Sequence, residues 1–415
     1  MAVVLQSRIH MDESKSTRRE FAPLPYHREM VEFLQRNEAP LWNWYASAGH
    51  KEKYADAIRL DLLKSTYRLE RSAHEPLYAA ADHVAKEFGL SIPITLYQAQ
   101  VDDRGHNAGI CCLPGEAHIV LRGDILSVLN ELETRALLGH ELSHYRFWWG
   151  EDEKYAIASR ILDAVACDSR CPGSFELSAL RFRRYTEIYA DRGALLACNN
   201  LDSVVACLVK ITTGLREISP AAYMSQADEI FAKGSVTDQG MTHPETFIRA
   251  RALKMWSHSE QDTDAAIRQM IEGDLQLDRL DLLGQRGLSE STRTFIADLL
   301  RPIWFRSETV LAHARLFFSD FKPVQDASAP TVYDKLKPLS KSAVDYYCYL
   351  LMDFAVADPA LDDLPLARAL EVADKINARE RLEELAYKEL KITKKNLARL
   401  RQEGPELLAK AGGAS

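Results

Sequence analysis

Residues 130–147 read NELETRALLGHELSHYRF, and this stretch decides the fold that the sequence predicts. It holds one glycine, Gly139, and no proline, and its apolar residues recur at helical spacing, so it predicts a helix. Residues four apart lie on one face of a helix, so His140 and His144 can present two imidazole nitrogens to one metal ion. Glu141 is rotated by about 100° from His140 and points beside that ion. The stretch therefore predicts two metal ligands and a catalytic base on one helix.

A third ligand is needed, because a catalytic zinc site uses three protein ligands and leaves a fourth position for water. The strongest candidate is Glu187, in the segment EIYAD on a second predicted helix at residues 180–197. Asp191 follows on the same helix face, where it could accept the ring N–H of a ligating histidine. Together these residues predict one Zn²⁺ per chain. The alternative is a pair of surface helices whose histidines and acids are solvated.

HExxH followed by ExxAD resembles the family of HtpX-like peptidases and CAAX prenyl endoproteases. Two more pieces occur in the family's order: Asn107-Ala108 before the first helix, and Thr242-His243-Pro244 with Arg249 after the second. The resemblance spans residues 77–255 and implies that Glu187 is the third zinc ligand. Membrane-embedded members flank this core with transmembrane helices, which this sequence does not display. Their prenylated or membrane substrates are therefore not carried over.

The resemblance also implies that His243 or Arg249 lies near the metal, where it stabilises the tetrahedral oxyanion or supports the ligands. For His243 the alternative is a residue at a helix start, since Pro244 is expected in the first turn of a helix from Glu245. For Arg249 the alternative is a salt bridge to Asp191 or to another acid. The sequence leaves open which of the two has which role.

Short β-branched segments at residues 92–97 and 117–121 predict a small sheet. An edge strand can bind an extended peptide through backbone hydrogen bonds. Residues 107–121 are the candidate for such an edge, with Asn107 and Ala108 as substrate-binding residues, and an ordinary paired strand is the alternative. The aromatic run YRFWW at residues 145–149 is interpreted as core packing below the site.

The predicted fold class is α+β, mainly helical, with a zincin-like metallopeptidase core, a small sheet and an all-α C-terminal domain. Residues 1–75 form a helical N-terminal segment, residues 76–273 the zinc metallopeptidase core, and residues 274–415 the C-terminal domain. A proline-punctuated connector at residues 321–330 divides that domain. The C-terminal helices are the candidate region for docking a regulatory protein partner or for limiting access to the site.

Composition narrows the classes of partner and compartment. The chain has 415 residues and a formal net charge of -8, which disfavours nucleic acid and anionic membrane surfaces as partners. Its seven cysteines do not resemble a disulfide framework and are interpreted as reduced thiols. The first residues lack the apolar core of a signal peptide, and no apolar stretch reaches the roughly 20 residues of a membrane span. We therefore expect a cytoplasmic protein without integral membrane association.

These observations predict a zinc-dependent endopeptidase that hydrolyses peptide bonds of cytoplasmic proteins. Zinc would activate a water molecule, and Glu141 would act as the general base. The alternative is a partner-binding or regulatory protein with a latent or structural zinc site, in which the C-terminal helices carry the function. An intact Glu141 argues against it, because a structural site has no use for a base beside an open coordination position.

Overall fold

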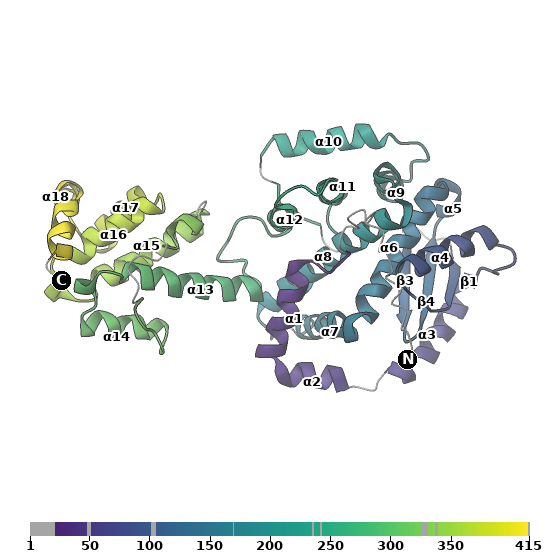
Figure 1. The fold of residues 1–415 in the computed structure, drawn as a ribbon, viewed down its shortest axis with the longest axis horizontal. Helices are drawn as coiled ribbons and strands as arrows, with labels where there is room; N and C mark the ends of the chain where they lie inside the picture. The colour runs from purple at the N-terminus through teal and green to yellow at the C-terminus, as the bar shows by residue number, and fades with distance from the viewer. Residues whose placement is uncertain are drawn as a thin grey trace, which may run out of the picture.

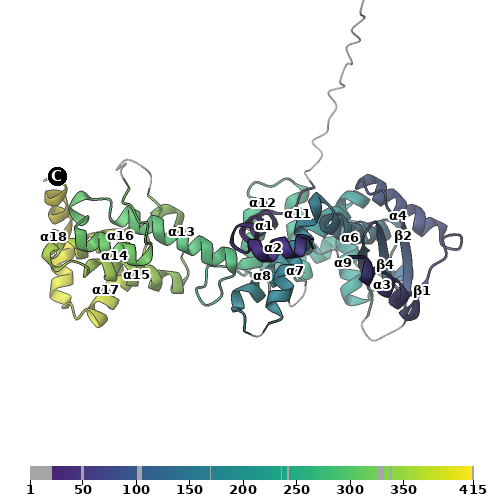
Figure 2. The ribbon, with the colours of Figure 1, turned by 90° about the horizontal axis from the view of Figure 1, so that it is seen from below.

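The computed structural model describes residues 21–47, 51–100, 105–168, 170–234, 236–240, 243–324, 331–336 and 339–413. Thr242, part of one predicted motif, lies outside these residues. Two views at right angles show an elongated molecule, in which helix α13 (Leu282–Leu299) connects a larger part that holds the sheet to a smaller helical part (Figures 1 and 2).

The helices of the larger part are α1 (Pro25–Asn37), α2 (Ala39–Ser47), α3 (Lys51–Ser65), α4 (Glu75–Glu87), α5 (Ile125–Val128), α6 (Glu131–Trp149), the 3-10 turn η1 (Glu151–Glu153), α7 (Lys154–Ala166), α8 (Gly173–Cys198), α9 (Leu201–Thr213), α10 (Pro220–Ala232), α11 (Thr246–Ser257) and α12 (Thr263–Glu272). After α13, the smaller part consists of η2 (Ile303–Phe305), α14 (Glu308–Phe317), η3 (Tyr333–Leu336), α15 (Lys341–Ala355), η4 (Pro359–Leu361), α16 (Leu364–Lys375), α17 (Arg379–Glu389) and α18 (Lys394–Gly413).

The sheet has four strands in the order β1-β2-β4-β3, namely β1 (Thr66–Arg68), β2 (Ile94–Ala99), β3 (Asn107–Leu113) and β4 (Glu116–Arg122). β2 and β4 run parallel, while β1 pairs antiparallel with β2 and β3 pairs antiparallel with β4. β3 therefore lies at one edge of the described sheet. The small sheet and the mainly helical α+β class expected from the sequence are confirmed.

Helices cover both faces of the sheet. Successive residues of a strand point to opposite faces, so neighbours in β2 and β4 enter different cores. Leu96 and Ile119 pack in a core with α4 and α6, whereas Tyr97 and Val120 pack against Leu62 of α3. Helix α6 also contacts β3. The sheet thus fixes α6 beside the edge strand β3.

A second core joins α1 to α7, α8, α11 and α12, with Met30, Tyr185 and Ile267 among its buried residues. Leu282 at the start of α13 belongs to this core. Phe295 near the other end of α13 belongs to a separate core that α14 to α18 complete. Helix α13 therefore begins in one hydrophobic core and ends in another. The domain boundaries expected at residues 75 and 273 stay predictions.

A buried carboxylate attaches α13 to the larger part. Asp281 caps α13 by accepting a hydrogen bond from Gly284 N at 2.8 Å. Tyr26 of α1 donates its hydroxyl to Asp281 at 2.6 Å, and Arg181 Nη1 of α8 lies 2.8 Å from it. Because these partners come from two other helices, the start of α13 is held in a defined orientation.

Helices α6 and α8 cross at very short range. A Cβ on Gly139 would lie 2.4 Å from Ala197 Cβ, and a Cβ on Gly193 would lie 1.7 Å from Ser143 Oγ. Ser143 Oγ is held at this place because it donates a hydrogen bond to Gly139 O at 2.6 Å. Only glycine at both positions allows the two helix backbones to come this close.

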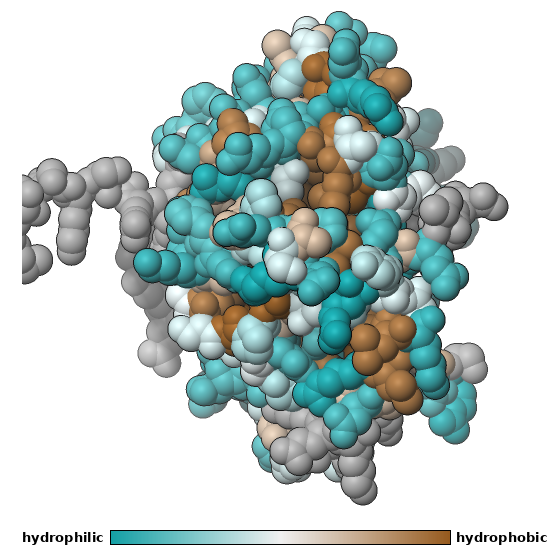
Figure 3. All heavy atoms as spheres, turned by 90° about the vertical axis from the view of Figure 1, so that its right-hand side faces the viewer, coloured by the Kyte–Doolittle hydropathy of each residue, from teal (hydrophilic) through white to brown (hydrophobic). Residues whose placement is uncertain are grey.

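Within the described ranges, no helix is both long enough and apolar enough to cross a membrane. The end of the molecule that holds the sheet presents a mainly hydrophilic surface with separate apolar patches (Figure 3). Exposed apolar side chains on α3 and β1 include Leu60, Leu63 and Tyr67.

Gly193→Ala is expected to lower the free energy of unfolding by about 1–3 kcal/mol, because the added methyl group overpacks the α6–α8 contact. Chemical denaturation would record this as a lower midpoint. Gly287→Ala is the matched control, since Gly287 lies inside α13 and an added Cβ meets no atom within 4 Å there. The control should gain about 0.5–1 kcal/mol from helix propensity. An unchanged midpoint for Gly193→Ala would contradict the close crossing.

Candidate metal centre

Helix α6 begins with a capping box that ties its first turn to neighbouring elements. Asn130 accepts a hydrogen bond from Glu133 N at 3.0 Å, and Glu133 accepts one from Asn130 N at 2.8 Å. The buried Glu133 also pairs with Lys210 Nζ of α9 at 2.9 Å, and the same ammonium donates to Val128 O of α5. The start of α6 is therefore fixed against α5 and α9, two turns before the histidines.

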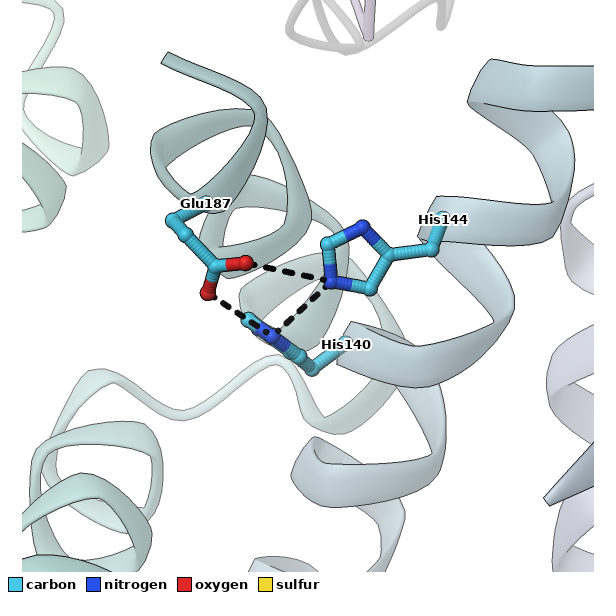
Figure 4. A group of neighbouring side chains, drawn as sticks. All are labelled: His140, His144 and Glu187. Carbon is cyan, nitrogen blue, oxygen red and sulfur yellow. Dashed lines mark hydrogen bonds and ion pairs between the residues drawn. The ribbon is translucent and has the colours of Figure 1, made fainter. Parts of the chain in front are cut away.

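Two histidines of α6 and one carboxylate of α8 converge on one point (Figure 4). His140 Nε2 lies 3.2 Å from His144 Nε2 and 3.4 Å from Glu187 Oε2. His144 Nε2 lies 3.6 Å from Glu187 Oε1. One ligand atom from each residue lies within 4.8 Å of the others, and the side chains are 14% exposed or less. Two imidazole nitrogens and a carboxylate oxygen are a ligand set that catalytic zinc uses.

The electrostatics of these residues fit a bound cation. Burial lowers the pKa of His140, but its hydrogen bond to Asp191 and the adjacent Glu187 carboxylate raise that pKa to about 10. Burial raises the pKa of Glu187, but the neighbouring histidines and Arg249 hold it below its usual range. Glu187 Oε2 is buried and receives no hydrogen bond of good geometry. A buried anionic oxygen needs a positive partner, so a divalent ion could replace the proton on His140.

Asp191 holds His140 in the orientation that metal binding requires. Asp191 Oδ1 accepts a hydrogen bond from His140 Nδ1 at 3.1 Å, which leaves Nε2 directed at the candidate site. Arg249 of α11 binds both oxygens of Asp191, through Nε at 2.8 Å and Nη2 at 2.6 Å. Its Nη2 also lies 3.6 Å from Glu187 Oε2. The salt bridge considered for Arg249 is therefore present, and it balances the charge of Asp191.

Glu141 lines the same cleft as the three candidate ligands, and only 5% of its surface is exposed. Burial raises the pKa of its carboxyl to about 7, against the lowering effect of His140. A carboxyl group with a pKa near neutrality can both accept and release a proton at neutral pH. Its place in the cleft beside the candidate ligands suits a general base.

The cleft around these residues has a volume of about 400 Å³. One wall is the edge strand β3, with Asn107, Ala108 and Ile110, and the other walls come from α6, α8 and α9. The aromatic run packs against cores as expected: Phe147 and Trp148 join one core, and Tyr145 and Trp149 join the other. Trp148 also lines the cleft. Successive helix residues point in different directions, so the run divides between two cores.

His243 lies between α10 and α11, with its Nε2 3.6 Å from Glu187 Oε1 and its side chain 54% exposed. Pro244 precedes the N-cap residue Glu245. The sequence predicted Pro244 in the first turn of this helix. That prediction is wrong, because α11 begins at Thr246 and Pro244 lies before it. Among the described site residues that contact Glu187, His243 is the most exposed to solvent.

Asp238, which no sequence pattern singled out, closes the loop that carries His243. Its Oδ1 accepts hydrogen bonds from Gly240 N at 3.0 Å and from Glu245 N at 3.1 Å. Its buried Oδ2 lies 2.7 Å from Arg184 Nε of α8, and Arg184 also donates to Gly240 O. Arg184 lies about one helical turn before Glu187. The pair therefore ties the His243 loop to the helix that supplies the carboxylate.

Part of the chain is similar to a plastoglobule-localized metallopeptidase 48 from the chloroplasts of Arabidopsis thaliana. The two are 27% identical over 157 residues, a match that covers 34% of this chain and 45% of the relative. The match thus spans less than half the length of that relative. No family model matches the chain, and no solved structure matches it. The likeness supports a relationship to metallopeptidases and reaches no further.

Asp191→Asn is expected to weaken zinc binding by roughly 10- to 100-fold, because the hydrogen bond that fixes the His140 tautomer loses its charge. Competition with a chromophoric chelator measures the affinity. Asp228→Asn is the control: Asp228 pairs with Arg251 and Lys254 on the same helix as Arg249, but its side chain is 46% exposed. Equal zinc affinity for both variants would rule out the assigned role of Asp191.

Asp238→Asn is expected to loosen the His243 loop while leaving the candidate ligands in place. Amide hydrogen exchange should become faster at Gly240 and Glu245, whose N–H groups donate to Asp238. Zinc affinity should change less than in Asp191→Asn, since Asp238 contacts none of the three candidate ligands. Slow exchange at both amides in the variant would show that the loop does not depend on this carboxylate.

Proposed function

We propose that this protein is a zinc-dependent endopeptidase, with His140, His144 and Glu187 as ligands and Glu141 as the general base. The observation that carries the proposal is the convergence of the three ligand atoms within 4.8 Å, with the buried carboxyl group of Glu141 lining the same cleft. A structural site would need neither an open cleft nor a base of this kind. The likeness to a metallopeptidase supports the same reading.

A zinc ion bound there would supply Lewis acidity and lower the pKa of water at the site. Residues of the chain transfer the proton and orient the ligands. Glu141 takes a proton from the attacking water and passes it to the leaving amine. Asp191 keeps the His140 tautomer fixed throughout, with Arg249 balancing its charge.

The contacts favour His243 over Arg249 as the group that stabilises the oxyanion. Arg249 already directs Nε and Nη2 at Asp191 and is buried, so moving it would leave a buried carboxylate unpaired. His243 is half exposed at the cleft and can donate an N–H to a carbonyl oxygen as negative charge develops. We therefore assign the ligand-supporting role to Arg249 and the substrate-contacting role to His243.

The shape of the cleft favours an extended polypeptide segment as the substrate. A volume of about 400 Å³ holds a few side chains and excludes a folded domain. β3 lies at the sheet edge and lines the cleft, so its backbone can pair with such a segment, with Asn107 and Ala108 nearest the start of the strand. Flexible segments of cytoplasmic proteins are the proposed substrates, and an HtpX-like ancestry is the proposed family.

The second candidate function is that of a partner-binding protein with a latent zinc site. The observation behind it is that α14 to α18 share a separate core with the end of α13, and their described residues do not line the cleft. Exposed apolar side chains of this smaller part, such as Ile303 of η2 and Leu316 of α14, could contact a regulatory protein. Tightly bound zinc without any cleavage of a broad peptide library would favour this function.

Glu141→Gln is expected to abolish peptide cleavage, with a fall in kcat of at least about 100-fold, while zinc stays bound. Turnover of an unfolded protein such as casein, together with metal analysis of the purified variant, measures both effects. Glu131→Gln is the matched control, because Glu131 lies in the first turn of the same helix and is exposed. A variant with full activity would refute the proposed mechanism.

A further inference from the structure

The turn between α17 and α18 gathers four exposed lysines on the smaller part of the molecule. Lys388 lies in the last turn of α17, Lys391 lies in the connecting turn, and Lys394 and Lys395 begin α18. These four residues are called the lysine turn here. Both helices lie in the half of the molecule opposite the sheet (Figures 1 and 2). The lysine turn is therefore separate from the cleft.

Hydrogen bonds and packing hold the backbone of this turn in place. Leu390 and Ile392 both donate their N–H groups to Ala386 O, at 3.1 and 3.3 Å, which closes the end of α17. The side chains of Leu390 and Ile392 pack against the core of the smaller part. Thr393 caps α18 by accepting a hydrogen bond from Asn396 N at 3.2 Å. The lysines thus extend into solvent from an anchored turn.

Neighbouring acids do not balance the positive charge of the lysine turn. Glu389 lies 3.5 Å from Lys388 Nζ. No other carboxylate of the described residues lies within 4.0 Å of any of the four ammonium groups. Arg399, further along α18, differs from these lysines because it pairs with Asp363. The lysine turn is therefore a local excess of positive charge on a chain whose formal net charge is -8.

The position of two of these lysines opposes the dipole of their own helix. The first turn of a helix carries a partial positive charge, which favours acidic side chains there and disfavours basic ones. The first turn of α18 begins with Lys394 and Lys395 and holds no acidic residue. Their ammonium groups therefore repel both each other and the helix end, and an acidic partner would relieve this repulsion.

The surroundings of the lysine turn favour a short acidic polypeptide segment over other polyanions. Charges more than about 8 Å apart are largely screened at physiological ionic strength, so a short ligand responds mainly to the lysines. A long nucleic acid would also meet the negative charge of the rest of the chain. An anionic membrane would need exposed apolar side chains beside the lysines, but Leu390 and Ile392 pack against the core. Tyr387 is exposed there instead, with its ring centre 5.4 Å from Lys394 Nζ.

From these observations we propose that the lysine turn is a docking surface for an acidic segment of another polypeptide. Glutamate or aspartate side chains of that segment pair with Lys391, Lys394 and Lys395. The inference goes beyond the proposed peptidase function and does not rest on it, because none of these lysines lines the cleft.

The test measures how the full-length protein binds a short, fluorescently labelled, glutamate-rich peptide, by fluorescence anisotropy. Lys394→Glu/Lys395→Glu should weaken binding at least about 10-fold, because two ion pairs become repulsive contacts. The variant should remain folded, since acidic side chains suit the start of a helix, and chemical denaturation checks this. Lys86→Glu/Lys410→Glu is the matched control: it reverses two exposed lysines elsewhere and should change the affinity less than about 2-fold.

Further ligands decide which chemistry the surface recognises. A peptide with glutamine in place of glutamate should not bind. Equal weakening by the two double variants, or no binding of the acidic peptide by the wild type, overturns the proposal. It is also overturned if a single-stranded oligonucleotide of equal charge, or vesicles with anionic phospholipid, bind the lysine turn more tightly than the peptide.

Glu141→Gln separates this inference from the proposed function. This variant should bind the acidic peptide as tightly as the wild type, because Glu141 lies in the cleft and not at the lysine turn. Peptide binding without any proteolysis by the wild type would contradict the peptidase and support the docking surface. Proteolysis without binding of the acidic peptide would contradict the docking surface and leave the peptidase.

Discussion

The close crossing of α6 and α8 is the constraint on which the rest of the site depends. Gly139 and Gly193 remove the side chains that would separate the helices, and Ser143 fills the remaining space. His140 follows Gly139 directly, and Glu187 precedes Gly193 by less than two turns, so the contact that brings the backbones together also brings the candidate ligands together. A wider crossing would leave Glu187 too far from both histidines for one ion to bridge them. The geometry of the centre is thus a consequence of packing between small residues.

Charge balance is the second constraint, because the carboxylates of Glu133, Glu187, Asp191 and Asp238 are buried and must have partners. Asp191 is balanced by Arg249, Glu133 by Lys210 and Asp238 by Arg184. Each pair joins two different helices, or a helix and a loop, so the ion pairs also fix the positions of α9, α11 and the His243 loop around α8 and α6. The charged neighbours of Glu187 all lie 3.4–3.6 Å away, at His140, His144, His243 and Arg249, so a cation bound between its carboxylate and the histidines would give it a closer partner.

Features set by local spacing were predictable from the sequence. The helix expected at residues 130–147 is α6, at Glu131–Trp149, and the strands expected near residues 92–97 and 117–121 are β2 and β4. The pairing of His140 with His144, and of Glu187 with Asp191, follows from helical periodicity alone. Trp148 packs against a core as expected, but the sequence did not show that it also lines the cleft, because an apolar residue has the same local pattern in both places. The isolated Gly193 inside a predicted helix was a signal of close packing that could have been used.

Sequence periodicity by itself determined helix α6, strands β2 and β4, and which residues of a helix share a face, because those depend on neighbours a few positions apart. It did not show β1, which lies in the segment expected to be helical. The tertiary structure alone decided that α6 and α8 cross at their glycines, that β3 is the edge strand beside the cleft, and that α9 lines it. It also decided that Asp238, Arg184 and Arg249 meet around α8 from distant parts of the chain. The physical reason is that these contacts join residues tens of positions apart, and their energies come from burial and charge pairing that no local pattern records.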